Sequence, residues 1–238
     1  GIDSKNMIPA QIMLKQNAVM KIFEQNDYKV VTFYGGGGAT GDDSFVDEKL
    51  CRNNTNNMDL RTTFVKTYLP FTYFKNSLIG DFHREKIDCF FTTIENYKED
   101  QEIPVYVHGH IRLPHFPYVY TQDGQHVYTN NDGDKDAYLE QLIFTDNKTL
   151  ELVDAIQNRS FESVIIIISD HGFRPDINWD DPSNEDFIRG FNTISAFYFP
   201  GKDLEIQEVS SVNTFRIFFN TYFDANYEIL DDRHIWYT

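Results

Sequence analysis

Short apolar runs of strand length alternate along the chain with longer segments whose apolar residues recur at helical spacing. The pattern predicts strands at Tyr28–Tyr34, Val105–Ile111, Val164–Ser169 and Thr193–Phe199. It predicts helices at Ile8–Gln25, Asp136–Gln157 and Val212–Phe223, and two helical pieces in Met58–Asn76 divided at Pro70. Asp88–Ile94, within the segment Glu85–Lys98, fits a strand or a helix equally well. Helices that alternate with short strands indicate an α/β domain with a mostly parallel sheet flanked by helices.

The segment Asp136–Gln157 gives the clearest helical pattern. Its apolar residues form one stripe, which we expect to face the core: Leu139, Leu142, Ile143, Leu150, Val153 and Ile156.

The most informative strand is VIIIISD, Val164–Asp170, which His171 and Gly172 follow directly. A continuous β-branched run is typical of a central strand that is covered on both faces. Ligands bind at the carboxyl edge of such sheets, and a carboxylate beside an imidazole suits Zn²⁺ or Mn²⁺ better than Ca²⁺ or Mg²⁺. The alternative is that Asp170 caps the next turn, His171 faces solvent and Gly172 makes the turn.

A second group of histidines lies in VHGHIRLPHFPYVY, residues 107 to 120. His108 and His110 should project the same way from a strand, and His115 follows in a segment that its flanking prolines keep extended. Together with Arg112 these histidines could line an anion pocket. Each of them could equally be an ordinary surface or packed histidine.

The composition narrows the class of partner. A length of 238 residues with 41% hydrophobic residues fits one large domain with a sizeable core. The net charge of −16 argues against binding to nucleic acid or to anionic lipid, so an anionic substrate would need a local positive centre such as a metal ion. Cys51 and Cys89 permit one disulfide or two thiols.

Three other motifs are weaker. GGGATG, residues 36 to 41, fits a dinucleotide loop, but Asp42 and Asp43 follow where pyrophosphate needs positive potential. Asp132, Asp134 and Asp136 begin like a calcium loop without its later ligands, so an acidic turn that caps the next helix is the better interpretation. Contiguous Ser169-Asp170-His171 cannot form a catalytic triad.

LPHFPY followed some fifty residues later by IIIISDHGFR resembles the sulfatase-like branch of the alkaline phosphatase superfamily, and especially its membrane-anchored members. The resemblance extends over roughly Met20 to Phe223. It implies that Asp170 and His171 are metal ligands and that His115 contacts the sulfuryl or phosphoryl group, with His110 as a second catalytic candidate. The implied metal is Zn²⁺ or Mn²⁺, with Ca²⁺ or Mg²⁺ as alternatives.

The chain departs from the family in one respect. Such enzymes take a Thr, Ser or formylglycine nucleophile from the N-terminal half of the fold, and neither that region nor a C-x-P-x-R signature is found here. We therefore expect residues 1–238 to form a single sulfatase-like domain, truncated at its N-terminus and inactive alone, with any metal held loosely or absent.

The expected parent protein is a membrane-anchored, extracytoplasmic hydrolase or transferase of sulfate or phosphate esters on a cell-surface glycan or lipid-linked substrate. The fragment itself is expected to be soluble, without contact to membrane or nucleic acid. The rival hypothesis is a non-catalytic domain of the same fold that binds surface polysaccharide or a protein partner, with Trp179 suited to stacking on sugar.

Overall fold

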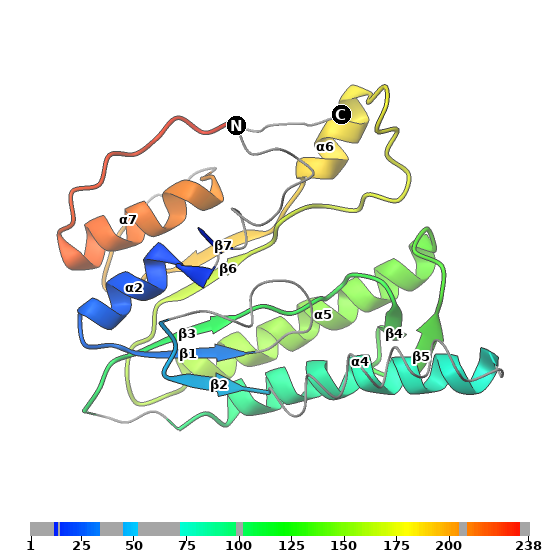
Figure 1. Cartoon of the computed structure of the whole chain (residues 1–238), viewed down its shortest axis with the longest axis horizontal. Helices are drawn as coiled ribbons and strands as arrows, with labels where there is room; N and C mark the ends of the chain where they lie inside the picture. Colours follow the sequence, from blue (N-terminus) through cyan, green and yellow to red (C-terminus); the bar gives the residue numbers. More distant parts are fainter. Residues whose placement is uncertain are drawn as a thin grey trace. The chain divides into compact units, whose positions relative to one another are not determined.

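The computed structural model describes residues 12–13, 15–33, 45–51, 72–98, 102–204 and 209–233, with side chains in the 72–98 segment from residue 78 onward. Contacts divide the chain into two compact units, Gly1–Ala155 and Ile156–Thr238, and each is described by itself. The helices and strands are shown in Figure 1. That the whole chain forms one domain stays a prediction.

The first unit is built on a parallel sheet of three strands, in the order β2-β1-β3. The strands are β1 (Lys29–Phe33), β2 (Glu48–Leu50) and β3 (Val105–Gly109). Val30, Val31 and Phe33 of the middle strand are buried, as expected for an apolar run covered on both faces. The predicted α/β class with a parallel sheet is confirmed.

Two helices pack on opposite faces of this sheet. The short helix α2 (Ala18–Gln25) begins at Asn17, which caps it, and its Phe23 ring stacks on Tyr106 with centroids 4.1 Å apart. The long helix α4 (Thr72–Glu95) covers the other face, where Phe90 fills the space beside Gly109 that a Cβ would occupy. Side chains alternate along a strand, so Tyr106 and Gly109 face opposite ways. The segment Asp88–Ile94, for which the sequence allowed a strand or a helix, lies within α4 and is helical.

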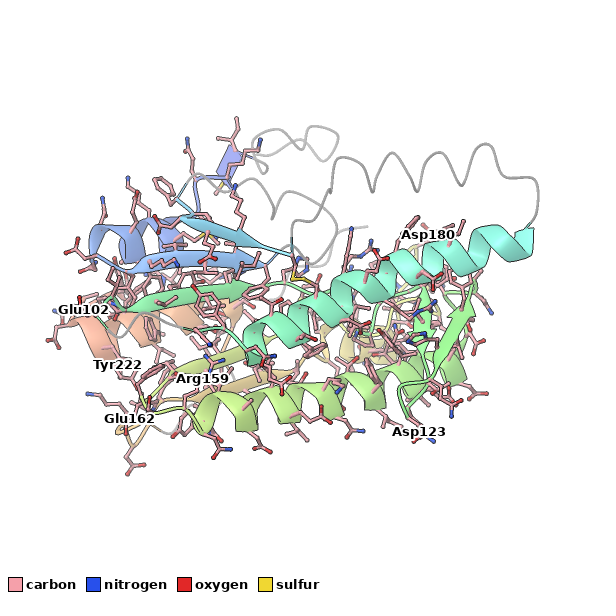
Figure 2. The ribbon with its side chains drawn as sticks, turned by 90° about the horizontal axis from the view of Figure 1, so that it is seen from below. Glu102, Asp123, Arg159, Glu162, Asp180 and Tyr222 are labelled. Atoms are coloured by element: carbon pink, nitrogen blue, oxygen red, sulfur yellow. A yellow bond between two sulfur atoms is a disulfide. The ribbon has the colours of Figure 1, made fainter. Side chains whose placement is uncertain are left out.

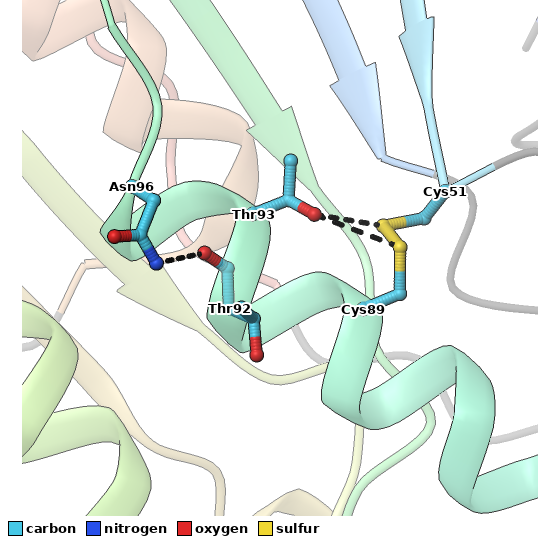
Figure 3. The surroundings of a disulfide bond; sticks show 5 residues. All are labelled: Cys51, Cys89, Thr92, Thr93 and Asn96. Carbon is cyan, nitrogen blue, oxygen red and sulfur yellow. Dashed lines mark hydrogen bonds between the residues drawn. A yellow bond between two sulfur atoms is a disulfide. The ribbon is translucent and has the colours of Figure 1, made fainter.

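A disulfide joins Cys51, directly after β2, to Cys89 of α4, with Cα atoms 5.8 Å apart. The Thr93 hydroxyl lies 3.6 Å from each sulfur (Figure 3). The bridge ties the carboxyl end of an edge strand to the helix beneath it. The sequence alone allowed either this disulfide or two separate thiols.

The described part of the first unit also contains a β-hairpin and most of a second long helix. The hairpin consists of β4 (Tyr118–Tyr120) and β5 (His126–Thr129), and the helix is α5 (Lys135–Gln157). Asp123 lies in the hairpin turn (Figure 2), where Gly124 adopts φ 76°. Two residues of α4 bind the hairpin. Arg84 donates to the Val127 carbonyl at 2.9 Å, and Asp88 accepts from the Tyr120 hydroxyl at 2.6 Å.

The buried face of α5 differs from the predicted one. Gln141, Phe144 and Thr145 are buried, whereas Leu139, Ile143 and Leu150 of the apolar stripe are exposed. The prediction of the helix is confirmed, but the prediction of its core face is wrong for these three residues. The reason is a polar requirement: Gln141 accepts from the backbone N–H groups of Val119 and Tyr120 in β4, and this turns its face inward.

In the residues that the structure describes, the second unit contains a two-stranded antiparallel sheet and two helices. The strands are β6 (Ile165–Ile168) and β7 (Ser195–Tyr198), and the helices are α6 (Asn184–Phe191) and α7 (Ser211–Phe223). The buried rings of Phe199, Phe218 and Phe219 form its core. Asn213 of α7 is also buried, and its amide bonds to both the N–H and the carbonyl of Leu230 in the C-terminal tail.

The strand β6 was predicted correctly, but not its surroundings. Its side chains are only partly buried, Ile168 is exposed, and its partner β7 runs antiparallel to it. Helix α6 was not predicted at all. Its sequence signal is the capping box of Ser183 and Asp186, in which each side chain bonds to the backbone of the other residue.

Some predictions fall outside the described residues: the start of the first helix, the kink at Pro70 and the glycine loop 36–41. Among the helices that the structure does describe, none combines the length and the apolar character needed to cross a membrane.

Candidate functional site

Asp170 and His171 lie where β6 ends, and two hydrogen bonds fix that end. The Ser169 N–H donates to the Ile194 carbonyl, and the Ile194 N–H donates to Ser169 Oγ, both at 3.0 Å. Ser169 thus anchors the strand to the segment before β7. Its hydroxyl is engaged with the backbone, in agreement with the exclusion of a catalytic triad.

The imidazole of His171 is oriented by the backbone of the next residue. Nδ1 lies 2.8 Å from the Gly172 carbonyl, which can only accept, so Nδ1 carries a proton. In the neutral ring Nε2 then has a free lone pair, and it faces Asp170 Oδ2 at 3.7 Å. The Asp170 side chain is 84% exposed and that of His171 27% exposed. Two electron-rich atoms that face each other at this distance favour a shared cation or a proton between them.

Gly172 has a packing role. A Cβ at this position would lie 2.1 Å from the Arg189 carbonyl oxygen and 2.9 Å from that of Asn192, at the end of α6. The Gly172 N–H donates to the Gly190 carbonyl at 3.1 Å. The backbone of Gly172 does not have the positive φ that favours glycine. The glycine is needed because the end of α6 lies too close for a side chain, and not for the turn suggested as the alternative.

The pair Asp170–His171 fits part of a metal site. Two ligands about 2.1 Å from a tetrahedral ion lie about 3.4 Å apart, close to the 3.7 Å between Oδ2 and Nε2. The hydrogen bond from Nδ1 also fixes a ligating histidine in the required tautomer. Within the described ranges, no group of three or more His, Cys, Asp or Glu side chains could hold a metal.

His115 belongs to the first unit, in the segment between β3 and β4, and its side chain is exposed. Its Nδ1 lies 3.3 Å from Arg112 Nη2 and 2.5 Å from the Phe116 carbonyl oxygen. The guanidinium can only donate and the carbonyl can only accept, so one Nδ1 cannot satisfy both at once. A proton on Nδ1 selects Phe116, and a lone pair on Nδ1 selects Arg112.

The other two histidines differ from each other. His108 lies within β3, half buried, and burial lowers its pKa, with a further lowering from His110. His108 is therefore a packed histidine, which was one of the alternatives that the sequence left open. β3 ends at Gly109, so His110 lies just beyond the strand, and the expectation that both project from one strand is wrong. His110 follows the carboxyl end of the parallel sheet.

The structure brings Asp170 to His171 and Arg112 to His115. His115 and the Asp170–His171 pair belong to different units, so their meeting at one sheet edge stays a prediction. No described contact tests the catalytic roles of His110 and His115.

The acidic turn before α5 has a structural role. Asp134 Oδ1 accepts from the Ala137 N–H at 3.1 Å and so caps the helix, as the sequence indicated. In the loop after β6, Trp179 is exposed and the guanidinium of Arg174 lies 5.7 Å from its ring centroid.

Comparison with known proteins gives one match. The family model for sulfatases matches residues 1–191, which is most of the chain and includes all four predicted site residues. A search of curated proteins and a search of solved structures found no match. The match indicates a sulfate-ester hydrolase-like function, with sulfate esters as the class of substrate. The chain belongs to the sulfatase family.

Proposed function

We propose that this protein acts on sulfate or phosphate esters with a divalent cation held by Asp170 and His171. One observation carries the proposal. In a chain of the sulfatase family, the Asp170 carboxylate and the free Nε2 of His171 face each other at 3.7 Å, while Nδ1 of His171 is tied to the backbone. Carboxylate and imidazole ligands favour Zn²⁺ or Mn²⁺ over Ca²⁺ or Mg²⁺.

Each residue has a definite task in this proposal. A bound cation offsets negative charge on the transferring group and lowers the pKa of an attacking hydroxyl or water. Asp170 and His171 hold it, and His115 donates to an oxygen of the sulfuryl or phosphoryl group or protonates the leaving group. His110 is the second candidate for that contact. Arg112, beside His115, adds positive charge that an anionic ester needs in a chain of net charge −16.

We further propose that the protein works outside the cytoplasm, on a glycan or lipid-linked substrate at the cell surface. The disulfide Cys51–Cys89 supports this location, because disulfides persist mainly in oxidising compartments. A membrane anchor in the parent protein is part of the same proposal.

The nucleophile is not identified in this sequence, and we propose that catalysis requires one from a longer chain. The test compares the 238-residue chain with the full-length gene product on aryl sulfate and aryl phosphate, with Zn²⁺ or Mn²⁺ supplied. We expect turnover only by the longer protein and its loss on Asp170→Ala, with Asp180→Ala, an exposed aspartate in the loop after β6, as the control. Turnover by the shorter chain that disappears in His115→Ala would show that it contains a nucleophile.

The second candidate function is binding without catalysis. It is favoured by the exposed Trp179, an aromatic ring of the kind that stacks on sugars, with the Arg174 guanidinium 5.7 Å from its centroid. Binding of a sulfated polysaccharide that Trp179→Ala abolishes, in a full-length protein without esterase activity, would establish this candidate.

A further inference from the structure

Gln141 of α5 makes an unusual set of contacts with the segment that carries His115. Its side chain is completely buried. Its Oε1 accepts from the N–H groups of Val119 and Tyr120, at 2.7 and 3.3 Å. Its Nε2 donates to the carbonyls of Pro114 and His115, both at 3.2 Å. A glutamine amide has two donor protons and two acceptor lone pairs, so these four contacts use its full capacity.

The backbone of this segment needs such a partner. Pro114 and Pro117 have no N–H to offer, and the pairing of β4 with β5 is irregular between Tyr118 and Tyr120. Such an irregularity leaves backbone groups without a partner in the ladder. Gln141 takes the place of a neighbouring strand for two buried N–H groups, which would be costly to leave without a partner, and for two partly buried carbonyls.

The two ends of the amide serve different parts of the segment. Oε1 holds β4, and Arg84 also holds the hairpin through the carbonyls of Val119 and Val127. Nε2 instead holds the main chain at Pro114 and His115, before the hairpin begins. Gln141 thus holds the His115 carbonyl, and the position of the main chain decides whether Nδ1 of the exposed ring reaches the Phe116 carbonyl or Arg112.

We propose that Gln141 is a positioning residue for His115: its Nε2 fixes the main chain at His115, so that the imidazole is presented to the ester in one orientation. The functional part of this proposal rests on the proposed role of His115. Its structural part, that Nε2 of Gln141 determines the state of the His115 ring, is independent of any substrate.

Two substitutions separate the two ends of the amide. Gln141→Leu removes all four hydrogen bonds at similar volume. Gln141→Glu keeps an acceptor for Val119 and Tyr120, but removes at least one of the two donors to the carbonyls of Pro114 and His115, because even a protonated carboxyl has only one. The matched control is Asn213→Leu, which removes an equally buried amide from the second unit, where it holds the Leu230 backbone.

The experiment measures histidine-ring ¹⁵N spectra of the folded 238-residue chain, together with hydrogen exchange of the Val119 amide. The native chain and Asn213→Leu should give one set of His115 ring signals. Gln141→Glu should shift or double these signals while the Val119 amide stays protected, and Gln141→Leu should lose both properties. Unchanged His115 signals in both Gln141 variants would overturn the proposal. If Gln141→Leu does not fold, Gln141→Glu decides by the same comparison.

Inorganic sulfate is the probe for the functional part. Titration into the native chain should move the His115 ring signals, and Gln141→Leu should weaken that response by about tenfold or more, since a small displacement of a binding group is costly. Gln141→Glu is left out of this comparison because its added charge repels sulfate. A native chain whose His115 ring ignores sulfate would refute the proposed role of His115, while the ring spectra without sulfate would still test the positioning. Equal responses of the native chain and a folded Gln141→Leu variant would refute the functional part alone.

Discussion

The Nε2 atom of His171 lies 3.7 Å from Oδ2 of Asp170, while Nδ1 of the same ring lies 2.8 Å from the Gly172 carbonyl. The residues are adjacent in sequence, yet this arrangement depends on distant ones. Ile194 fixes the end of β6 through Ser169, and the end of α6 packs against Gly172. The pair is therefore held from both sides of the loop. Such support from surrounding contacts is what holds ligands in the geometry that a metal requires.

The first prediction concerns metal binding by this pair. With two ligands identified, the 238-residue chain should bind Zn²⁺ or Mn²⁺ weakly in a calorimetric titration, and Asp170→Asn should weaken binding by about tenfold or more because it removes a charged ligand. Asp180→Asn makes the same chemical change in the following loop and should leave the affinity within about twofold. Equal losses in the two variants would mean that Asp170 is not a ligand.

The second prediction concerns the distance between His115 and the metal ligands. We expect His115 to lie within about one substrate's width of a cation on Asp170 and His171, because the resemblance to sulfatases assigns these three residues to one active site. Paramagnetic Mn²⁺ should then broaden the ring signals of His115 more than those of His126 in β5, and Asp170→Asn should remove the difference. Broadening of His126 with sharp His115 signals would separate His115 from the metal.

The third prediction concerns Gly172. Gly172→Ala should destabilise the second unit by about 1–3 kcal/mol, since its Cβ would meet the carbonyls of Arg189 and Asn192 and backbone must move. Metal affinity should fall with it, because the same loop carries Asp170 and His171. The control is Gly133→Ala, whose Cβ would meet only the Asn131 side chain at 3.6 Å. Thermal unfolding of both variants checks this, and equal melting temperatures would contradict it.

The fourth prediction concerns pH. Burial, followed by the charge of His110, lowers the pKa of His108 below its value of 6.5 in the unfolded chain. The unfolded state therefore takes up a proton first, so the contribution to stability is present above pH 6.5 and is lost as pH falls toward the folded-state pKa. In urea titrations His108→Gln should show a smaller loss of unfolding free energy on acidification than the native chain. The exposed His126→Gln controls for the substitution, and an identical pH dependence of native and His108→Gln would contradict the prediction.

The fifth prediction concerns the disulfide. Cys51 and Cys89 are 38 residues apart, and closing a loop of that size stabilises the folded state by about 4 kcal/mol through the entropy of the unfolded chain. Unfolding in guanidinium should therefore shift to lower denaturant when a reductant is added. A double variant, Cys51→Ser with Cys89→Ser, should match the reduced chain and ignore the reductant. A native chain that also ignores it would show that the two thiols are not bridged.

The sequence by itself determined where most elements lie and what chemistry they carry. The runs of β1, β3 and β6 and the pattern of α5 and α7 predicted those elements within a few residues. The reason is that an apolar run, a helical period or a capping residue acts through neighbours in the chain. For the same reason Asp170 and His171 could be found as a strand-end pair, and Asp134 as a helix cap.

The tertiary structure decided the partners. The antiparallel pairing of β6 with β7, the disulfide and the contacts of Gln141 each join residues far apart in the chain. The face that α5 buries shows why the pattern was insufficient: apolar residues such as Leu150 stay exposed while Gln141 is buried. Hydrophobic periodicity reports the transfer of side chains from water, whereas Gln141 is buried because four backbone groups elsewhere require hydrogen bonds, and that requirement exists only once the chain has folded.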